Sequence, residues 1–286
     1  FFFLKKERIE KIRDEAETAV REGSNNLILS DKKIGTSRAS IPSVIAVGAV
    51  HSHLVKLGIR GYCSINVESS DILDTHSFAV LIGVGATTIN PYLAIESIYE
   101  RFQKKLFSNL DFETCVAKFK KSIDDGLLKI MSKMGISVIS SYRGGCNFEA
   151  VGLSRAIVAD YFPGMSSRIS GIGIAGIEKK IKEHHKKFIS KNIVALPIGG
   201  IYRYRKTGEN HQFQGNLIHI LQHAVGTGSY ENYKRYSKGI HDLPPISLRD
   251  LLDFKQKNKS INIDEVEPLE QILKRFGSGS MSHGAL

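Results

Sequence analysis

Closely spaced histidines are the first residues of this sequence that could do chemistry. His219 and His223 stand four positions apart, and on a helix this spacing brings two side chains to one face, where they could chelate a metal ion. Zinc peptidases have a glutamate directly after the first histidine, whereas this sequence has Ile220 there. The other close pairs are His51 with His53 and His184 with His185. Residues one or two positions apart on a helix point in different directions, so we expect core or capping histidines and no metal site.

The stretch GIGIAG matches the glycine pattern of dinucleotide-binding loops at Gly171, Gly173 and Gly176. Such a site needs a strand directly before the motif and an acidic residue about 20 positions after it. The preceding residues, PGMSSRIS, do not have the pattern of a strand, and no carboxylate occurs near position 196. We therefore expect a tight turn into a helix at Ile177 and no nucleotide site.

The stretch SYRGG places Arg143 between a predicted strand over 135–141 and a glycine loop. In parallel α/β folds ligands bind where strands end, and an arginine there could hold a carboxylate or a phosphate by two parallel hydrogen bonds. The alternative is a structural arginine that braces loop carbonyls or pairs with Glu149. The sequence leaves both open. Cys146, in the same loop, has no identifiable base nearby, so we do not expect it to be a nucleophile.

Strands and helices alternate along the sequence, which predicts an α/β fold with a parallel sheet and flanking helices. Apolar residues at helical spacing predict a first helix that ends at Gly23, and Pro42 and Pro91 suit the first turns of two later helices. A long helix is expected over 111–134, either continuous or broken near Gly126. The other expected elements are strands over 26–30, 60–69 and 135–141 and after Gly85, and helices over 75–83, 217–224 and 230–238.

The chain has 40 basic and 29 acidic residues, a formal net charge of +11, which could attract nucleic acid or an acidic protein. In the densest basic stretch, 178–191, the positions Ile177, Ile181, His185 and Phe188 have helical spacing, which predicts an inner apolar face and an outer face of solvated lysines. No aromatic residues alternate with the charges as stacking platforms would, so we expect no nucleic-acid binding. No apolar run is long enough to span a bilayer, so no membrane span is expected.

Cys63, Cys115 and Cys146 are too few and too far apart for a disulfide framework or a metal knuckle. The sequence closes on GSGSMSHGAL, which is typical of a loop whose backbone amides approach an anion or a flat cofactor. It opens on FFFL, without an initiator methionine. We expect both ends to be cuts in a longer chain.

Seven stretches, taken together, carry a family resemblance. They are IPSVIAVGAVHSHLVKLGIR, FAVLIGVGATTINPYLAIESI, GLLKIMSKMGISVISSYRGG, FEAVGLS, LQHAVGTGSYENYKRYS, SLRDLLDF and DEVEPLEQILKRFGSGSMSHGAL. They occur in this order and extend over essentially all 286 residues. In this combination the sequence resembles glutamate synthase, specifically the large chain of that enzyme.

The resemblance implies a longer protein with an amino-terminal glutaminase domain, a central α/β domain, an FMN-binding (β/α)8 barrel with an iron–sulfur cluster, and a carboxy-terminal β-helix. Residues 1–255 are then expected to be the central domain, truncated at its amino-terminal end. Residues 256–286 are expected to be a linker and the truncated beginning of the FMN barrel.

The resemblance also places one loop beside the flavin. Gly279, Ser280, Met281 and Ser282 are expected to lie next to FMN and 2-oxoglutarate. The family usually has an alanine and an aromatic residue where this chain has Ser280 and His283, so the contacts of this loop are not carried over individually.

The implied reaction makes two glutamates from glutamine and 2-oxoglutarate. Ammonia is released at a distant cysteine and crosses an internal tunnel, and reduced FMN delivers a hydride to 2-iminoglutarate. The implied cofactors are FMN, with FAD as the alternative flavin, and a 3Fe–4S cluster, and none is expected on this chain alone. Cys63, Cys115 and Cys146 match neither the catalytic cysteine nor those of the cluster, so we expect the chain to connect the two reaction sites and to perform no chemistry itself.

The electron donor and the compartment are expectations of the same kind. A composition rich in lysine, isoleucine and asparagine suggests an organelle genome, which favours ferredoxin as donor and the plastid or chloroplast stroma as location. The alternative is NADPH through a partner subunit, with a bacterial cytoplasm as the alternative location. A further hypothesis, outside the enzyme class, is that the chain is a stand-alone basic binding module.

Overall fold

The computed structural model describes residues 6–190, 204–205, 208–255 and 260–275. The chain divides into two compact units, Phe1–Lys191 and Asn192–Leu286, and each is described by itself. Among the helices of the described residues, none is both long enough and apolar enough to cross a membrane.

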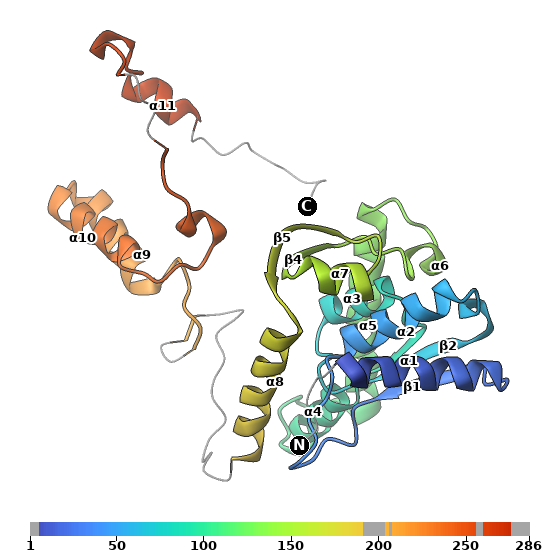
Figure 1. Ribbon diagram of the computed structural model, residues 1–286. Helices are drawn as coiled ribbons and strands as arrows, with labels where there is room; N and C mark the ends of the chain where they lie inside the picture. The colour runs from blue at the N-terminus through green and yellow to red at the C-terminus, as the bar shows by residue number, and fades with distance from the viewer. Residues whose placement is uncertain (1–5, 191–203, 206–207, 256–259, 276–286) are drawn as a thin grey trace. The chain divides into compact units, whose positions relative to one another are not determined.

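The first unit is built on a sheet of three parallel strands, β1 (Asn26–Ser30), β2 (Ser64–Glu68) and β3 (Thr88–Asn90), in the order β1-β2-β3. Helices α1 (Lys6–Arg21) and α2 (Ser43–Lys56) lie side by side next to this sheet, and α2 contacts both β1 and β2 (Figure 1). The predicted α/β fold with a parallel sheet and flanking helices is confirmed.

The two faces of this sheet differ in burial because side chains alternate along a strand. Leu27, Ile65 and Val67 belong to the main hydrophobic core and are buried together with residues of α1 and α2. On the opposite face Ile28 is 69% exposed. One face of the sheet therefore supplies the core of the unit.

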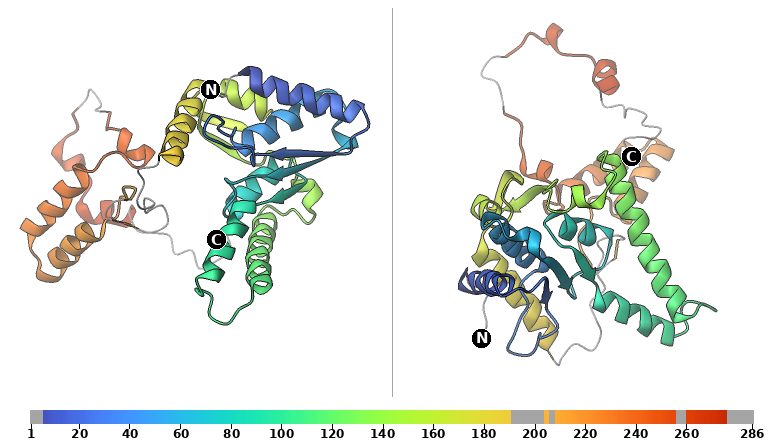
Figure 2. Two further views of the ribbon diagram at one scale, coloured as in Figure 1. Left: turned by 90° about the horizontal axis from the view of Figure 1, so that it is seen from below. Right: turned by 90° about the vertical axis from the view of Figure 1, so that its right-hand side faces the viewer.

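Helix α5 (Phe112–Lys133) packs against α3 (Thr75–Gly83) and α4 (Tyr92–Gln103) (Figure 2). It is continuous, so of the two sequence-based alternatives the unbroken helix is the correct one. Gly126 has a packing reason instead: a Cβ there would lie 2.5 Å from Cγ2 of Thr75. The missing side chain lets α3 and α5 approach closely.

The strand predicted over 135–141 is wrong. The structure has the short helix α6 (Ile139–Tyr142) there, and the preceding Val138 is 52% exposed. Val138 and Ile139 are exposed and do not lie on a sheet, and β-propensity has an effect only on a pleated, half-buried surface. The side chain that is buried is Tyr142, which lies in a second hydrophobic cluster with Met131.

A second pair of parallel strands follows, β4 (Glu149–Leu153) and β5 (Ser166–Ile172), with α7 (Arg155–Tyr161) between them. Neither strand was predicted. Helix α8 (Ile174–Ile189) comes next, as expected from the basic stretch.

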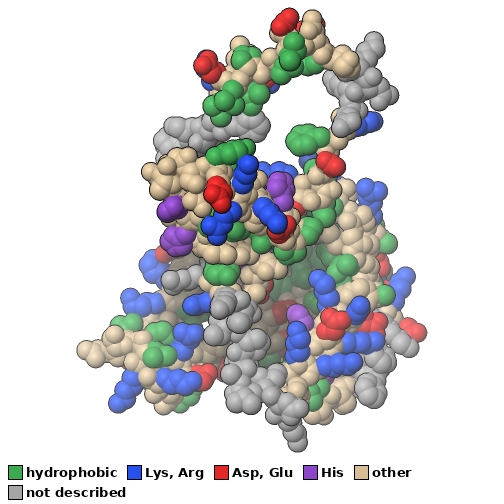
Figure 3. All heavy atoms as spheres, turned by 90° about the vertical axis from the view of Figure 1, so that its left-hand side faces the viewer, with side chains coloured by type: hydrophobic (Ala, Val, Ile, Leu, Met, Phe, Trp, Pro, Cys, Tyr) green, Lys and Arg blue, Asp and Glu red, His purple; other side chains and the backbone are tan. Residues whose placement is uncertain are grey.

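The outer face of α8 carries the lysines, as the sequence predicted. Ile177 is buried, and Ile181 and His185 are half-buried. Phe188, the fourth residue expected on the inner face, is 73% exposed, because the last turn of α8 extends beyond the core. On the face drawn in Figure 3, the basic side chains of the described residues are interspersed with acidic and hydrophobic ones.

The second unit contains a helical hairpin. Helices α9 (Gly215–Thr227) and α10 (Tyr230–His241) confirm the two helices predicted there, and Gly228 joins them in a left-handed conformation, with φ 65°. Gly239 of α10 lies against the side chain of Leu217, so a larger residue there would separate the helices. The remaining described elements are the 3-10 turns Leu248–Leu251 and Ile263–Glu265 and the helix α11 (Leu269–Arg275).

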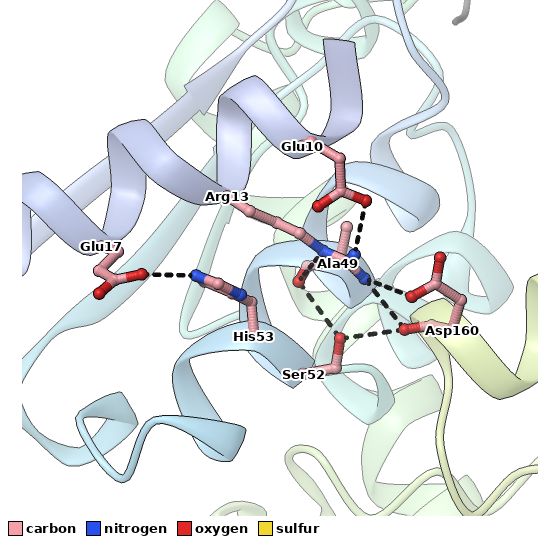
Figure 4. A network of polar contacts seen from close by, with 7 residues as sticks. All are labelled: Glu10, Arg13, Glu17, Ala49, Ser52, His53 and Asp160. Atoms are coloured by element: carbon pink, nitrogen blue, oxygen red, sulfur yellow. Dashed lines mark hydrogen bonds and ion pairs between the residues drawn. The ribbon is translucent and has the colours of Figure 1, made fainter. Parts of the chain in front are cut away.

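One buried arginine joins three helices of the first unit (Figure 4). Arg13 of α1 is 6% exposed and donates to the Ala49 carbonyl of α2 at 3.2 Å and to the Asp160 carbonyl of α7 at 3.0 Å. Its charge is balanced by the carboxylates of Asp160 at 3.1 Å and Glu10 at 3.0 Å. The guanidinium also lies over the Tyr161 ring, 5.1 Å from its centroid. The contacts with Ala49, Asp160 and Tyr161 hold α1 against α2 and α7.

Candidate functional site

The loop that the family resemblance placed beside the flavin lies outside the described residues. Gly279, Ser280, Met281 and Ser282 therefore stay a prediction. Among the described residues, no group of three or more histidine, cysteine, aspartate or glutamate side chains is placed to hold a metal ion.

The glycine motif spans the end of β5 and the first turn of α8. A strand does precede it, which the sequence analysis missed, and Gly173 is the N-cap residue of α8, as the predicted turn into a helix requires. A Cβ at Gly171 would collide with the carbonyl oxygen of Gly152 on β4. The close approach that this glycine permits is thus to the neighbouring strand.

The histidines have structural partners of their own. His53 Nε2 lies 2.9 Å from Oε2 of Glu17 and so links α2 to α1 (Figure 4). His223 Nδ1 accepts a hydrogen bond from Nδ2 of Asn232 at 2.9 Å, across the α9–α10 hairpin. His185 lies 3.4 Å from the Thr36 carbonyl. These contacts give His53, His185 and His223 structural roles.

Cys146 does not have the surroundings of a nucleophile. Burial raises the pKa of its thiol, which favours the unreactive protonated form. Its backbone has φ 48° and its amide donates to the Gly83 carbonyl at 3.0 Å. Cys63 and Cys115 are buried and free.

Arg143 follows the short helix α6. It was expected at the carboxyl ends of the strands, but it lies at their amino ends. Its side chain lines a pocket of about 600 Å³ together with residues that precede or begin the strands. We call this the arginine pocket. Its lining residues are Asn25, Asn26, His51, Arg60, Gly61, Tyr62, Cys63, Ser64, Thr87, Ser140 and Arg143. Among the described residues, no side chain pairs with the Arg143 guanidinium. Glu149, the partner considered from the sequence, pairs with Arg168 at 3.6 Å instead.

Arg60 is the fixed group of the arginine pocket, and the sequence analysis did not single it out. It lies in the 3-10 turn Arg60–Tyr62, which is why β2 begins later than the strand expected over 60–69. Its Nη1 donates to the Cys63 carbonyl at 2.5 Å and its Nη2 to the Gly85 carbonyl at 2.9 Å. Nε donates to Nδ1 of His51 at 3.0 Å. The guanidinium is thereby held in one orientation.

His51 is neutral in this pocket. Burial, followed by the charges of Arg60 and Arg143, lowers its pKa to about 4. Its Nδ1 accepts the hydrogen bond from Arg60, so protonation there would remove that bond and add a third positive charge. The imidazole is enclosed by two glycines, because a Cβ at Gly85 or Gly144 would collide with the ring.

This arrangement predicts that His51 makes stability depend on pH. Its pKa in the folded protein lies below the ordinary value of 6.5, so its stabilising contribution is complete above pH 6.5 and is lost as the pH falls toward 4. Because the ring is only partly buried, we expect the free energy of unfolding to fall by about 1–2 kcal/mol over this pH range. The measurement is the free energy of unfolding of the wild type and of His51→Gln between pH 7.5 and 4.5. The difference between them should shrink toward acid pH, and two parallel curves would contradict the account.

A second pocket, of about 560 Å³, lies at the carboxyl edge of β1 and β2. Asp31 is the centre of a hydrogen-bond cluster there and accepts from Ser69, Ser70 and the Tyr92 hydroxyl at 2.7–2.9 Å. Burial opposes its ionisation, but these hydrogen bonds together keep the pKa of Asp31 below its ordinary value. Burial, with Asp31 adding to it, raises the pKa of Tyr92 to about 12. The cluster joins the ends of three strands and has its hydrogen bonds satisfied internally.

These features define a parallel α/β domain with a pocket at each end of its strands, and its described residues bring together no group of three or more histidine, cysteine, aspartate or glutamate side chains that could hold a metal ion. The profile of the glutamate synthase central domain matches residues 3–154, and that of a conserved region in glutamate synthase matches residues 211–286. The chain belongs to the glutamate synthase family.

Named relatives agree with this assignment. The NADPH glutamate synthase large chain of Azospirillum brasilense is 53% identical over 98% of this chain, and that of Bacillus subtilis is 40% identical over 95%. The ferredoxin-dependent glutamate synthase of Pyropia yezoensis is 39% identical over 98%. The chain spans only 18–19% of the length of these relatives.

Proposed function

We propose that this chain is part of a glutamate synthase large chain, in which it connects the site that releases ammonia from glutamine to the site that forms glutamate. The observation that carries the proposal is the match to glutamate synthase large chains over 95–98% of the chain. For the same reason we do not propose a stand-alone basic module. Within this proposal residues 1–255 form the central domain, and residues 256–286 form the linker and the beginning of the FMN barrel.

The overall reaction of the whole protein would be glutamine plus 2-oxoglutarate plus two electrons and two protons, giving two glutamates. A flavin supplies the two-electron chemistry when bound. We propose that FMN and a 3Fe–4S cluster belong to parts of the protein beyond this chain, with Gly279, Ser280, Met281 and Ser282 contributing one loop at the edge of the flavin site. The described residues would position and enclose the route between the sites.

Two electron donors are candidates. The NADPH large chain from Azospirillum brasilense is 53% identical, against 39% for the ferredoxin-dependent protein of Pyropia yezoensis, and this difference favours NADPH through a partner subunit over the ferredoxin expected from composition. The same comparison favours a bacterial cytoplasm over a plastid. Ferredoxin and the chloroplast stroma stay as the second proposal, since ferredoxin-dependent relatives match the chain over most of its length.

The test is glutamate formation by the intact protein purified with its natural partners. With glutamine, 2-oxoglutarate and a donor, two glutamates should form for each 2-oxoglutarate consumed, and leaving out either substrate should stop the reaction. NADPH and reduced ferredoxin are supplied in separate assays, and the active donor decides between the two candidates. Absence of glutamate with both donors would contradict the proposed function.

A further inference from the structure

The arginine pocket has an unbalanced charge. Arg60 and Arg143 both line it, and no aspartate or glutamate is among the described residues that do. Arginine keeps its charge at any physiological pH, and His51 is neutral there, so the pocket carries two positive charges. Elsewhere in the first unit a buried arginine is matched by carboxylates, as Arg13 is by Asp160 and Glu10. The arginine pocket lacks such a partner within the described chain.

The two arginines are held differently. Arg60 has its Nε, Nη1 and Nη2 bound to His51, Cys63 and Gly85, so it provides a fixed positive charge at the wall. Arg143 is exposed, and its guanidinium makes no hydrogen bond to any described residue. A planar guanidinium with free donors matches a carboxylate or a phosphate by two parallel hydrogen bonds.

The remaining wall of the pocket is polar. Asn25 and Asn26 contribute amides from the start of β1, and Ser64 and Ser140 contribute hydroxyl groups. The volume of about 600 Å³ is within the range of small-molecule sites. These groups could hydrogen-bond further oxygen atoms of a ligand whose charged group is held by the arginines.

We propose that the arginine pocket binds a small molecule that carries a carboxylate or a phosphate group, with Arg143 as the contacting residue and Arg60 as the fixed positive charge behind it. The ligand chemistry follows from two guanidinium groups, donor-rich walls and the absence of a carboxylate among the described lining residues. The proposed function assigns no ligand to the first unit, so this binding site goes beyond it.

The experiment is isothermal titration calorimetry of the intact protein at constant ionic strength, with inorganic phosphate and succinate as separate probes. At least one probe should bind the wild type, and which of them binds identifies the anion class. Arg143→Ala should weaken that binding at least tenfold. Arg143→Lys keeps the charge but loses the planar fork, so it should bind more weakly than the wild type and more tightly than Arg143→Ala.

Arg101→Ala is the matched control, because it removes the same charge from an exposed position on α4 that is not part of the pocket. The affinity of Arg101→Ala for the probe that binds should stay within twofold of the wild-type affinity. Three outcomes would overturn the proposal: no binding of either probe, equal binding by Arg143→Ala and the wild type, or lower thermal stability of Arg143→Ala without added anion. The last would mean that an acidic side chain of the protein itself fills the pocket.

Discussion

Replacing Arg13 with methionine is expected to lower the free energy of unfolding by about 2–4 kcal/mol, because it removes hydrogen bonds to two main-chain carbonyls of different helices at once. Methionine keeps much of the apolar length of the side chain, so the loss reports the guanidinium. The carbonyls of Ala49 and Asp160 would lose their donor, and Asp160 would keep a charge without its partner. The measurement is urea unfolding of the full chain followed by circular dichroism.

Arg21→Met is the matched control on the same helix. Arg21 also pairs with a carboxylate, Glu17, at 2.7 Å, but its side chain is 56% exposed. Exposed ion pairs contribute little to stability, so the free energy of unfolding of Arg21→Met should fall by less than about 1 kcal/mol. If Arg13→Met is too unstable to purify, Arg13→Lys, which keeps the charge and one donor group, should show an intermediate loss. Equal losses for Arg13→Met and Arg21→Met would contradict the role of Arg13 as the junction of three helices.

Replacing Gly171 with alanine is expected to destabilise the first unit by about 2–3 kcal/mol, as overpacking against atoms that cannot move does. The added methyl would collide with the carbonyl group of Gly152, which belongs to the backbone of the paired strand β4. Gly152 lies where the register of the two strands shifts, between Val151 and Leu153. Thermal unfolding of the full chain measures the loss.

Gly35→Ala controls for the general effect of removing a glycine. No atom lies within 4 Å of a Cβ placed at Gly35, and its backbone does not have positive φ. This variant should unfold within about 0.5 kcal/mol of the wild type. An unchanged stability of Gly171→Ala would mean that the strands are not as close as described, and it would reopen the reading of the glycine motif as a ligand loop.

The helices of the first unit could be predicted because their buried faces follow a helical period. Ile9, Ala16 and Val20 of α1 are all buried, and Gly23, with φ 95°, follows its end. Strand β5 could not be predicted in this way. Its side chains are mostly exposed, as with Ile169 at 41%, so no alternation of buried and exposed residues marks it.

The candidate site could be predicted only in part, for a reason of chain distance. Arg143 was singled out because a glycine loop follows it. His51 and Arg60 belong to the same pocket through tertiary packing between segments more than 80 residues away along the chain, which no local pattern encodes. The edge of the sheet was also predicted wrongly, since the expected strand over 135–141 is a helix and Arg143 therefore does not extend the carboxyl edge.

The proposed role of this chain is to connect an ammonia-releasing site to a glutamate-forming site. The most direct test is a tracer experiment on the intact protein, with glutamine labelled with ¹⁵N at the amide, 2-oxoglutarate, the active electron donor and an excess of unlabelled ammonium. The account predicts that the glutamate made from 2-oxoglutarate keeps the full ¹⁵N label, because ammonia passes between the sites without mixing with the solution. Label diluted to the level of the ammonium pool would contradict it.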